Sequence, residues 1–494
     1  MEGDARSTTH PIQQRIATEA EANSAFDDIT YKKGQSFLRM LESFLGEDVF
    51  SDGILRYMAA HEYSNTTTAD LWNALSEASN KSVAEIAAGW TEQPGFPVVN
   101  VKREADGKVQ FSQERFTVNF KNAPPLLWEV PLTYSVVGGT STTLLMTEKT
   151  ASPENIPADR ALKLNVNGAG NYRVQYDEPS WQLLLKALPK LGVEDSVNLM
   201  SDAWALVQAG RAPVSLYLGL VEKLPASTDL AEREQFINVL DFMNDLLVGS
   251  SEREKFQRYA RSLLCPTFET LGWEPKAGES PNSGRLRASL ISALGDLNDP
   301  EIIAGSRKRF DKYLADPTSL PPDLRAPVLA VVGRYADENT WNKLHELGLK
   351  TTSSEDKQNY YNALACATDP KLVNKTLAIA LTDELPTSRA TFLVSRVARD
   401  SGRPDIAWDF AKANMKTLLA KVDAAGANRY APSLFIFFSD QSRADELKHY
   451  AEKNLPQATA PEMAKAVDEI RFRAEFKTRL GAELNTWIDR KEQR

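Results

Sequence analysis

Histidine is the side chain that most often completes a catalytic zinc site, and this 494-residue chain contains only four. The zinc-helix motif H-E-x-x-H places two histidines four positions apart, so that both imidazoles project from one helical face. His61 and His345 are each followed by glutamate, but the fourth position after them holds Asn65 and Leu349. We therefore expect no complete zinc site from this chain alone. The four histidines are His10, His61, His345 and His449.

The other common chemical motifs are also missing. The two cysteines, Cys265 and Cys366, are far apart and lie in apolar helical contexts, which predicts buried free thiols rather than a metal site or a disulfide framework. No phosphate-binding loop G-x-x-x-x-G-K-[ST], dinucleotide fingerprint or G-x-S-x-G nucleophile elbow occurs. The spacing of residues alone therefore does not indicate which reaction this protein would catalyse.

Charge and hydropathy exclude several classes of partner. Lys and Arg number 58 against 67 Asp and Glu, a net charge of −9, so no basic excess exists to neutralise nucleic-acid phosphates or an anionic membrane. No stretch approaches the roughly 18 apolar residues of a membrane span. Residues 1–6 match neither a signal nor a transit peptide and suggest a start inside something longer. We expect a soluble protein whose compartment, cytoplasmic or periplasmic or secreted, depends on a missing N-terminal portion.

Three regions with different periodicity must position any functional group. Residues 1–95 have helical spacing, with Phe37, Met40, Leu41 and Phe44 on one face and Gly46 as a stop. Thr68 is expected to cap a helix over 69–79. Residues 177–494 return to helical spacing with recurrent polar breaks, which favours a curved, solenoid-like array of helix pairs.

Residues 96–176 instead alternate with period two, which predicts a small β-sandwich. Pro131 is expected at an edge or a bulge, because proline has no amide hydrogen to donate to a ladder. The predicted strands cover 96–101, 109–111, 116–120, 128–136, 144–146, 162–166 and 172–176.

Several segments of the chain have a distinctive sequence. The first run from Ser7 to Ile12 (STTHPI) and from Phe26 to Gly34 (FDDITYKKG), and WTEQPGFPVV at 90–99, WEVPLTY at 128–134 and NYRVQYD at 171–177 follow downstream. Together they resemble the aminopeptidase N family of zinc metallo-aminopeptidases (gluzincins), which includes the puromycin-sensitive and endoplasmic-reticulum aminopeptidases. Order and spacing both fit, and the similarity extends over essentially the whole chain.

The resemblance implies a mainly α fold in three parts. Residues 1–95 would be the C-terminal helical part of a thermolysin-like catalytic domain, 96–176 the β-sandwich, and 177–494 a large helical domain similar to HEAT or ARM arrays. The family's H-E-x-x-H zinc helix and its G-A-M-E-N substrate-amine motif would precede this chain, and neither occurs in it. The implied cofactor is zinc in the full-length family, with none expected on this chain alone.

One catalytic side chain of the family is present by the same resemblance. The tyrosine of the segment D-x-I-T-Y-x-K-G corresponds to Tyr31, whose hydroxyl would face the scissile carbonyl. A pre-placed O–H donor stabilises the negative charge that develops on that oxygen. Without the resemblance, a tyrosine opening an amphipathic helix is more simply a core residue with its hydroxyl near water.

Three functional interpretations remain open. The chain is expected to be the C-terminal portion of an enzyme that removes N-terminal residues from peptides, inactive without a separate or missing N-terminal catalytic portion. Its helical domain would cap the active-site chamber. A second interpretation is a non-catalytic helical-array module that binds peptides or proteins, and a third is a hydrolase with unrecognised metal ligands.

The family architecture also predicts an exposed apolar surface in residues 1–95. These helices would pack on catalytic-domain helices that this chain lacks. We expect that surface to involve Phe37, Met40 and Phe44.

Overall fold

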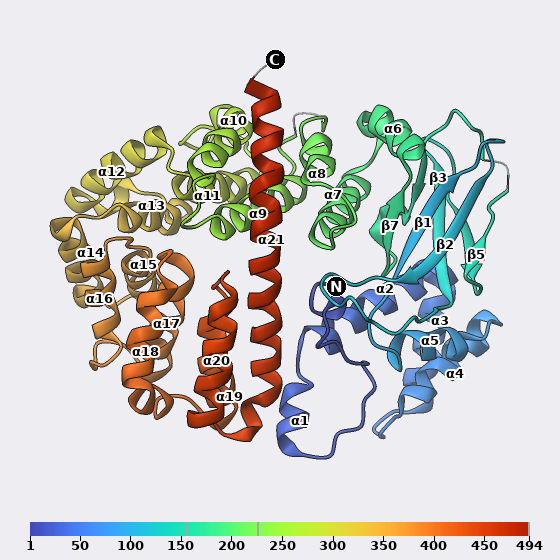
Figure 1. Cartoon of the computed structure of the whole chain (residues 1–494), viewed down its shortest axis with the longest axis horizontal. Coiled ribbons are helices and arrows are strands. Elements are labelled where there is room, and N and C mark those ends of the chain that lie inside the picture. The colour runs from blue at the N-terminus through green and yellow to red at the C-terminus, as the bar shows by residue number, and fades with distance from the viewer. Residues whose placement is uncertain (155, 225–226, 493–494) are drawn as a thin grey trace. The chain divides into compact units, whose positions relative to one another are not determined.

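The computed structural model describes residues 1–154, 156–224 and 227–492, which belong to two compact units, Met1–Pro225 and Ala226–Arg494. The first unit contains helices, two small β-sheets and further helices, and the second is entirely helical in its described part (Figure 1). This arrangement confirms the predicted mainly α fold with a small β component.

Helices of the region 1–91 form because apolar residues recur on one face and capping residues set the ends. Gly46 ends α2 with φ of 89°, a backbone conformation that side chains other than glycine rarely adopt. Helix α4 begins at Thr68, one residue earlier than predicted, and its N-cap is Thr67 rather than Thr68. The elements are α1 (Glu19–Ser24), η2 (Ile29–Lys33), α2 (Gly34–Leu45), α3 (Glu47–Ala60), α4 (Thr68–Ser79) and α5 (Val83–Thr91).

The prediction that Phe37 and Met40 lie on an exposed surface is wrong. Both side chains are buried, and the ring of Phe37 packs edge-on against Trp72 and stacks on Trp90 at centroid distances of 5.7 and 5.9 Å. Phe44 is partly buried against the same core. The large apolar side chains that are exposed in this region are Ile16, Phe26, Tyr31, Leu55, Met58 and Tyr63.

The strands form a four-stranded sheet in the order β5-β2-β1-β7 and a three-stranded sheet in the order β4-β3-β6. β1 pairs antiparallel with β2 and parallel with β7, and β3 pairs antiparallel with both its neighbours. The strands are β1 (Pro97–Arg103), β2 (Val109–Arg115), β3 (Val130–Val136), β4 (Thr142–Met146), β5 (Thr150–Ala151), β6 (Leu162–Leu164) and β7 (Arg173–Tyr176).

Two strand predictions need correction. Residues 116–120 are not a strand, because their amides pair outside any ladder: Phe116 N–H donates to Phe96 and Val118 N–H to Ala5. Pro131 lies in β3, the central strand of its sheet. It pairs with Leu145 on one side only, since the pairing of β3 with β6 begins at Tyr134, so the expectation of an edge holds locally.

Helices α6 (Glu178–Ala187), α7 (Val193–Gln208) and α8 (Val214–Val221) follow the sandwich within the first unit. In the second unit α9, α11, α13, α15, α17 and α19 contact one another in sequence, and α10, α12, α14, α16 and α18 pack beside them. The long helix α21 contacts α19 and α20 and also returns to α10, near the start of the array. These helices are α9 (Leu230–Leu246), α10 (Arg253–Leu271), α11 (Pro281–Asp296), α12 (Pro300–Ala315), α13 (Pro322–Arg334), α14 (Glu338–Lys350), α15 (Ser354–Ala365), α16 (Pro370–Ile379), α17 (Thr387–Asp400), α18 (Pro404–Leu419), α19 (Ala424–Phe435), α20 (Gln441–Asn454) and α21 (Ala460–Glu492).

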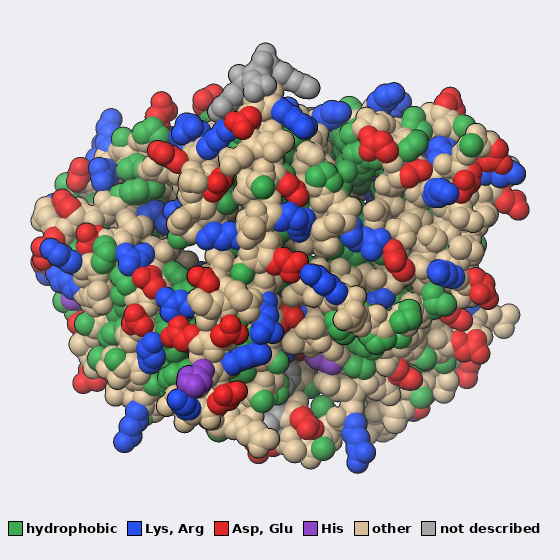
Figure 2. Space-filling view, in the orientation of Figure 1, with side chains coloured by type: hydrophobic (Ala, Val, Ile, Leu, Met, Phe, Trp, Pro, Cys, Tyr) green, Lys and Arg blue, Asp and Glu red, His purple; other side chains and the backbone are tan. Residues whose placement is uncertain are grey.

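The surface carries both signs of charge interspersed. On the face drawn in Figure 2, basic and acidic side chains alternate and neither forms a continuous field. None of the helices in the described ranges is long and apolar enough to cross a membrane. Both cysteines are free thiols. Cys366 is buried as predicted, whereas Cys265 is only partly buried.

Candidate active site around Tyr31

Tyr31 lies at the centre of η2, a single π-helical turn that leads directly into α2. The side chain is 62% exposed, and its ring lies 6.3 Å from that of Phe26. The neighbours Ile29 and Lys33 in the same turn are buried. A π turn spaces side chains differently from an α-helix and is frequent at functional sites. This turn therefore presents the phenol to solvent while its flanks are anchored.

Asp27 organises the start of the turn. Its Oδ1 accepts hydrogen bonds from the amides of Ile29 and Thr30 at 3.0 and 3.2 Å, and its carbonyl oxygen accepts from the amide of Tyr31 at 3.2 Å. The other carboxylate oxygen lies 2.9 Å from Nε2 of His10. His10 thus links the preceding loop to the turn that carries Tyr31.

Lys33 anchors the end of the turn. Its Nζ donates to the carbonyl oxygens of Gln93 and Gly95 at 3.1 and 2.8 Å and lies 3.2 Å from Oδ2 of Asp4. Both charged side chains are 3% exposed. Burial lowers the pKa of Lys33, and the nearby Asp4 carboxylate opposes that shift. Two hydrogen bonds to carbonyl oxygens and the adjacent carboxylate offset the cost of burying this charge.

Asp4 ties the same cluster to the crossover from α5 to β1. Its Oδ1 accepts from the Gly95 amide at 2.9 Å and from the Thr9 hydroxyl at 2.5 Å. Gly95 adopts φ of 83°, a backbone conformation that side chains other than glycine rarely adopt. Three segments that are distant in sequence, the chain start, the π turn and the α5–β1 crossover, are therefore held around one ion pair.

Sequence reasoning missed the Asp4–Lys33 pair, although a signal was available. Lys33 lies four positions before Phe37, on the apolar stripe of the helix that follows. A lysine on a buried helical face needs a partner. Nothing in the spacing of residues identifies Asp4 as that partner.

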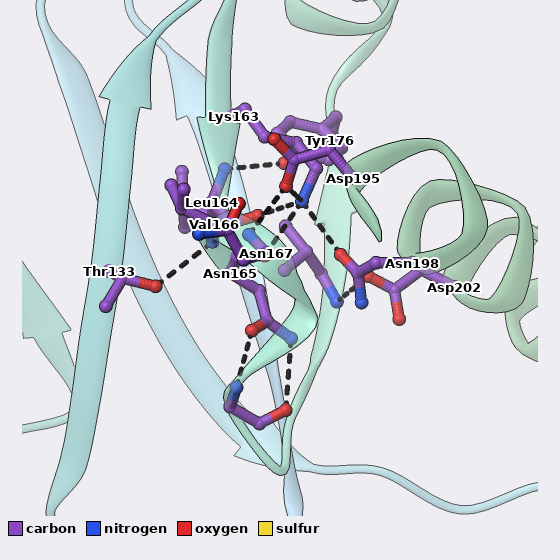
Figure 3. A network of polar contacts seen from close by, with 12 residues as sticks. Thr133, Lys163, Leu164, Asn165, Val166, Asn167, Tyr176, Asp195, Asn198 and Asp202 are labelled. Carbon is purple, nitrogen blue, oxygen red and sulfur yellow. Dashed lines mark hydrogen bonds and ion pairs between the residues drawn. The ribbon is translucent and has the colours of Figure 1, made fainter. Parts of the chain in front are cut away.

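A second buried cation lies in the sandwich of the same unit (Figure 3). Lys163 of β6 donates to the carbonyl oxygens of Leu164 and Asn165 and to Oδ1 of Asn198 on α7, and it lies 3.4 Å from Oδ1 of Asp195. Burial lowers the pKa of Lys163. This ammonium group joins a strand to the helix that packs on it.

Arg173 connects β7 to α7 through its guanidinium group. Its Nη1 donates to the Ser201 hydroxyl at 2.7 Å and to Oδ1 of Asp202 at 3.2 Å, while Oδ2 of Asp202 accepts from the amide of Val174. The Tyr176 hydroxyl accepts from the amide of Leu164 at 2.9 Å. These groups hold β6 and β7 against α7, and none of them is exposed for substrate.

Asp202 predicts a pH-dependent contribution to stability. Burial raises its pKa to about 6, against the opposing effects of Arg173 and Lys163. Because the folded-state pKa is raised, the contribution of Asp202 is fully present below its ordinary pKa of 3.8 and is lost as pH rises through 6. We expect the unfolding free energy of wild type, relative to Asp202→Asn, to fall by about 1 kcal/mol between pH 5 and pH 7. Urea denaturation at both pH values measures this change in unfolding free energy. The control variant Glu194→Gln, on the same helix, is expected to keep the pH dependence of wild type.

The described residues do not fit a zinc ion. No group of three or more His, Cys, Asp or Glu in the described ranges could hold a metal. Both ring nitrogens of His10 already face oxygen atoms, of Pro11 and Asp27, and Nε2 of His345 faces Glu384 at 2.7 Å. A zinc site for this fold would need donors from elsewhere.

Comparison with known proteins assigns the family. The model of the ERAP1-like C-terminal domain matches residues 161–472, and that of the Peptidase family M1 domain matches residues 1–90. Aminopeptidase 2 of Candida albicans is 30% identical over 390 residues, which cover 77% of this chain and 42% of that protein. Mitochondrial Aminopeptidase 2 of Saccharomyces cerevisiae is 25% identical over 494 residues, 98% of this chain and 52% of that protein.

A plant relative gives the same result. Aminopeptidase M1-A of Oryza sativa subsp. japonica is 27% identical over 507 residues, which cover 98% of this chain and 56% of the rice protein. The chain thus spans about half the length of the curated relatives it matches. The chain belongs to the M1 aminopeptidase family and corresponds to the C-terminal portion of its members.

Proposed function

We propose that this chain supplies the C-terminal portion of a peptide-hydrolysing aminopeptidase and contributes Tyr31 to its active site. The observation that carries this proposal is the presentation of Tyr31: an exposed phenol on a π turn whose flanking residues are buried. During attack on a peptide bond, negative charge develops on the carbonyl oxygen. A fixed phenol hydroxyl can donate a hydrogen bond to that oxygen.

The metal chemistry is assigned to a separate polypeptide portion. M1 family aminopeptidases are zinc enzymes, and a bound zinc ion supplies the activated water for hydrolysis. Because the described residues of this chain offer no ligand set, we propose that the chain alone is inactive. In the complete enzyme the helical array is proposed to cap the active-site chamber and limit the entry of long peptides.

Exposed apolar side chains support the need for another portion. Phe26, Leu55, Met58 and Tyr63 are each at least 60% exposed, three of them on or beside α3. Large exposed apolar groups clustered on one element are typical of surfaces that another protein segment covers. We propose that the upstream catalytic portion packs on these side chains.

Reconstitution tests the proposal. The purified chain is mixed with the separately expressed polypeptide encoded upstream of its own coding sequence, and hydrolysis of leucine p-nitroanilide is followed with zinc supplied. Activity of the mixture, with neither part active alone, is the expected result. Tight zinc binding and hydrolysis by the chain alone would instead support a complete hydrolase. Peptide binding without any reconstituted activity would support the helical-array binding module.

A further inference from the structure

A small pocket lies between α15 and α17 in the second unit, far along the chain from Tyr31. It has a volume of about 210 Å³ and contains both apolar and polar groups. Apolar walls come from Leu385, Pro386, Phe392 and Leu393, and the ring of Phe392 is 48% exposed although it borders the pocket. Drug-sized ligands generally occupy about 300–1,000 Å³, so this pocket fits a smaller molecule.

The charged side chains that line the pocket are all positive. Lys357 and Arg389 line it, and no aspartate or glutamate does. Within the described residues neither cation has a carboxylate partner. The one contact recorded for the Lys357 ammonium group is with the ring of Tyr361, at 6.0 Å from its centroid. Two cations that lack acidic partners beside one apolar pocket favour an anionic ligand.

The titratable groups next to Tyr361, which are Glu384 and His345, already have hydrogen-bond partners. The Tyr361 hydroxyl donates to Oε2 of Glu384 at 3.0 Å, and Nε2 of His345 lies 2.7 Å from the same oxygen. In the described residues Glu384 forms its ion pair with His345 and none with Lys357 or Arg389. Asp356, on the same helix as Lys357, is paired with Arg325.

The backbone adds to the positive potential. Ser354 and Lys357 lie in the first turn of α15, and Arg389 lies in the first turn of α17. The N-cap of α17 is Pro386, which makes no side-chain capping hydrogen bond. The amino-terminal ends of helices carry a partial positive charge, so that of α17 favours an anion here, whereas that of α15 is capped by Ser353 and carries Glu355 and Asp356 in its first turn.

We propose that this pocket binds a small carboxylic acid with an apolar or aromatic group. The carboxylate lies between Lys357 and Arg389, and the apolar group packs on Phe392, Leu385 and Leu393. The polar side chains Ser354, Gln358 and Asn362 complete the rim. This site does not depend on the peptidase assignment, since it uses no residue of the Tyr31 region.

Calorimetric titration of the full chain with phenylacetate tests the proposal. We expect saturable binding that is weakened about tenfold by Lys357→Gln and by Arg389→Gln, because each removes one charged contact of the carboxylate. Phenylacetamide, which has the same shape without the charge, is expected to bind about tenfold more weakly than phenylacetate. Phe392→Ser is expected to weaken phenylacetate binding while leaving the preference for the acid intact.

Controls separate this site from general charge effects. Lys371→Gln removes an exposed cation on α16 outside the pocket and is expected to leave phenylacetate binding unchanged. Thermal melting confirms that the variants fold, as expected for side chains without ion-pair partners. Equal binding of phenylacetate and phenylacetamide, no binding of phenylacetate, or wild-type affinity in both pocket-cation variants would overturn the proposal. Stronger binding of N-acetylglycylphenylalanine than of phenylacetate would identify the carboxylate source as a peptide terminus.

Discussion

Replacing Lys33 with alanine is expected to lower the unfolding free energy of the first unit by about 3–5 kcal/mol. The substitution leaves the buried Asp4 carboxylate without its cation and leaves the carbonyl oxygens of Gln93 and Gly95 without their donor. Breaking a buried ion pair from one side costs more than the pair itself contributes, because the remaining charge stays out of water. Urea denaturation followed by tryptophan fluorescence measures the change, since Trp72 and Trp90 lie in the adjoining core.

The neighbouring residue provides the matched control. Lys32 forms an ion pair with Asp28 in the same turn, but both side chains are largely exposed to solvent. Lys32→Ala is therefore expected to change the unfolding free energy by less than about 1 kcal/mol. The double variant Asp4→Ala/Lys33→Ala should lose less than the sum of the two single variants, because neither charge is then left alone. Similar losses for Lys32→Ala and Lys33→Ala would show that the buried pair does not anchor the turn.

Periodicity predicted the helices and most strands because burial on one face requires it. Gly46 ended a helix as expected, since its positive φ is a local property of the backbone. The segment 116–120 shows where the method fails. Its alternating apolar residues resemble a strand, but its amides pair with Phe96 and Ala5. Such partners, distant in sequence, cannot be deduced from spacing.

The exposed surface was mispredicted for a related reason. Phe37 and Met40 lie on the apolar face of α2. An apolar face indicates that some other segment packs on it, but not which segment. In the structure the cover includes Trp72 and Trp90 from later helices of the same unit. Leu55 and Met58, by contrast, are exposed on α3. Sequence pattern identifies apolar faces, but only tertiary structure distinguishes covered faces from open ones.

The candidate site could be predicted only in part. Tyr31 came from resemblance to a family segment, and composition or spacing alone would have left it among ordinary core tyrosines. Its anchors are a different case. His10 lies in a segment that the resemblance included, whereas Asp4 and Lys33 were not selected. Their pairing depends on how the chain start, the π turn and the α5–β1 crossover come together.

The anchors explain how an exposed side chain can still be well placed. A catalytic donor must be fixed before the reaction, because reorientation during the reaction reduces its effect. Tyr31 has few contacts of its own, so its position depends on the backbone of η2. Asp27 holds one end of that turn, and Lys33 holds the other. Loss of Lys33 should therefore impair reconstituted activity at temperatures where the unit remains folded.

Replacing Tyr31 with phenylalanine is expected to lower kcat of the reconstituted aminopeptidase about 100- to 1,000-fold, with little change in KM. The substitution removes only the hydroxyl. The ring contact with Phe26 and the backbone hydrogen bonds of the turn remain, so the unfolding free energy should change by less than about 0.5 kcal/mol. Steady-state hydrolysis of leucine p-nitroanilide and urea denaturation measure the two quantities separately.

Comparing the change in kcat with the change in unfolding free energy distinguishes a catalytic hydroxyl from a structural one. Tyr63 is another exposed tyrosine of the same region, and Tyr63→Phe, which keeps the ring, is expected to retain wild-type kcat. If Tyr31→Phe also retained it, no oxyanion contact could be assigned to this phenol, although the fold assignment would stand. A loss of rate together with an equally large loss of stability would instead place Tyr31 with structural tyrosines such as Tyr176, whose hydroxyl accepts a hydrogen bond from the Leu164 amide. A loss of kcat at unchanged stability is the result that the proposed hydrogen bond from Tyr31 to the charged substrate oxygen requires.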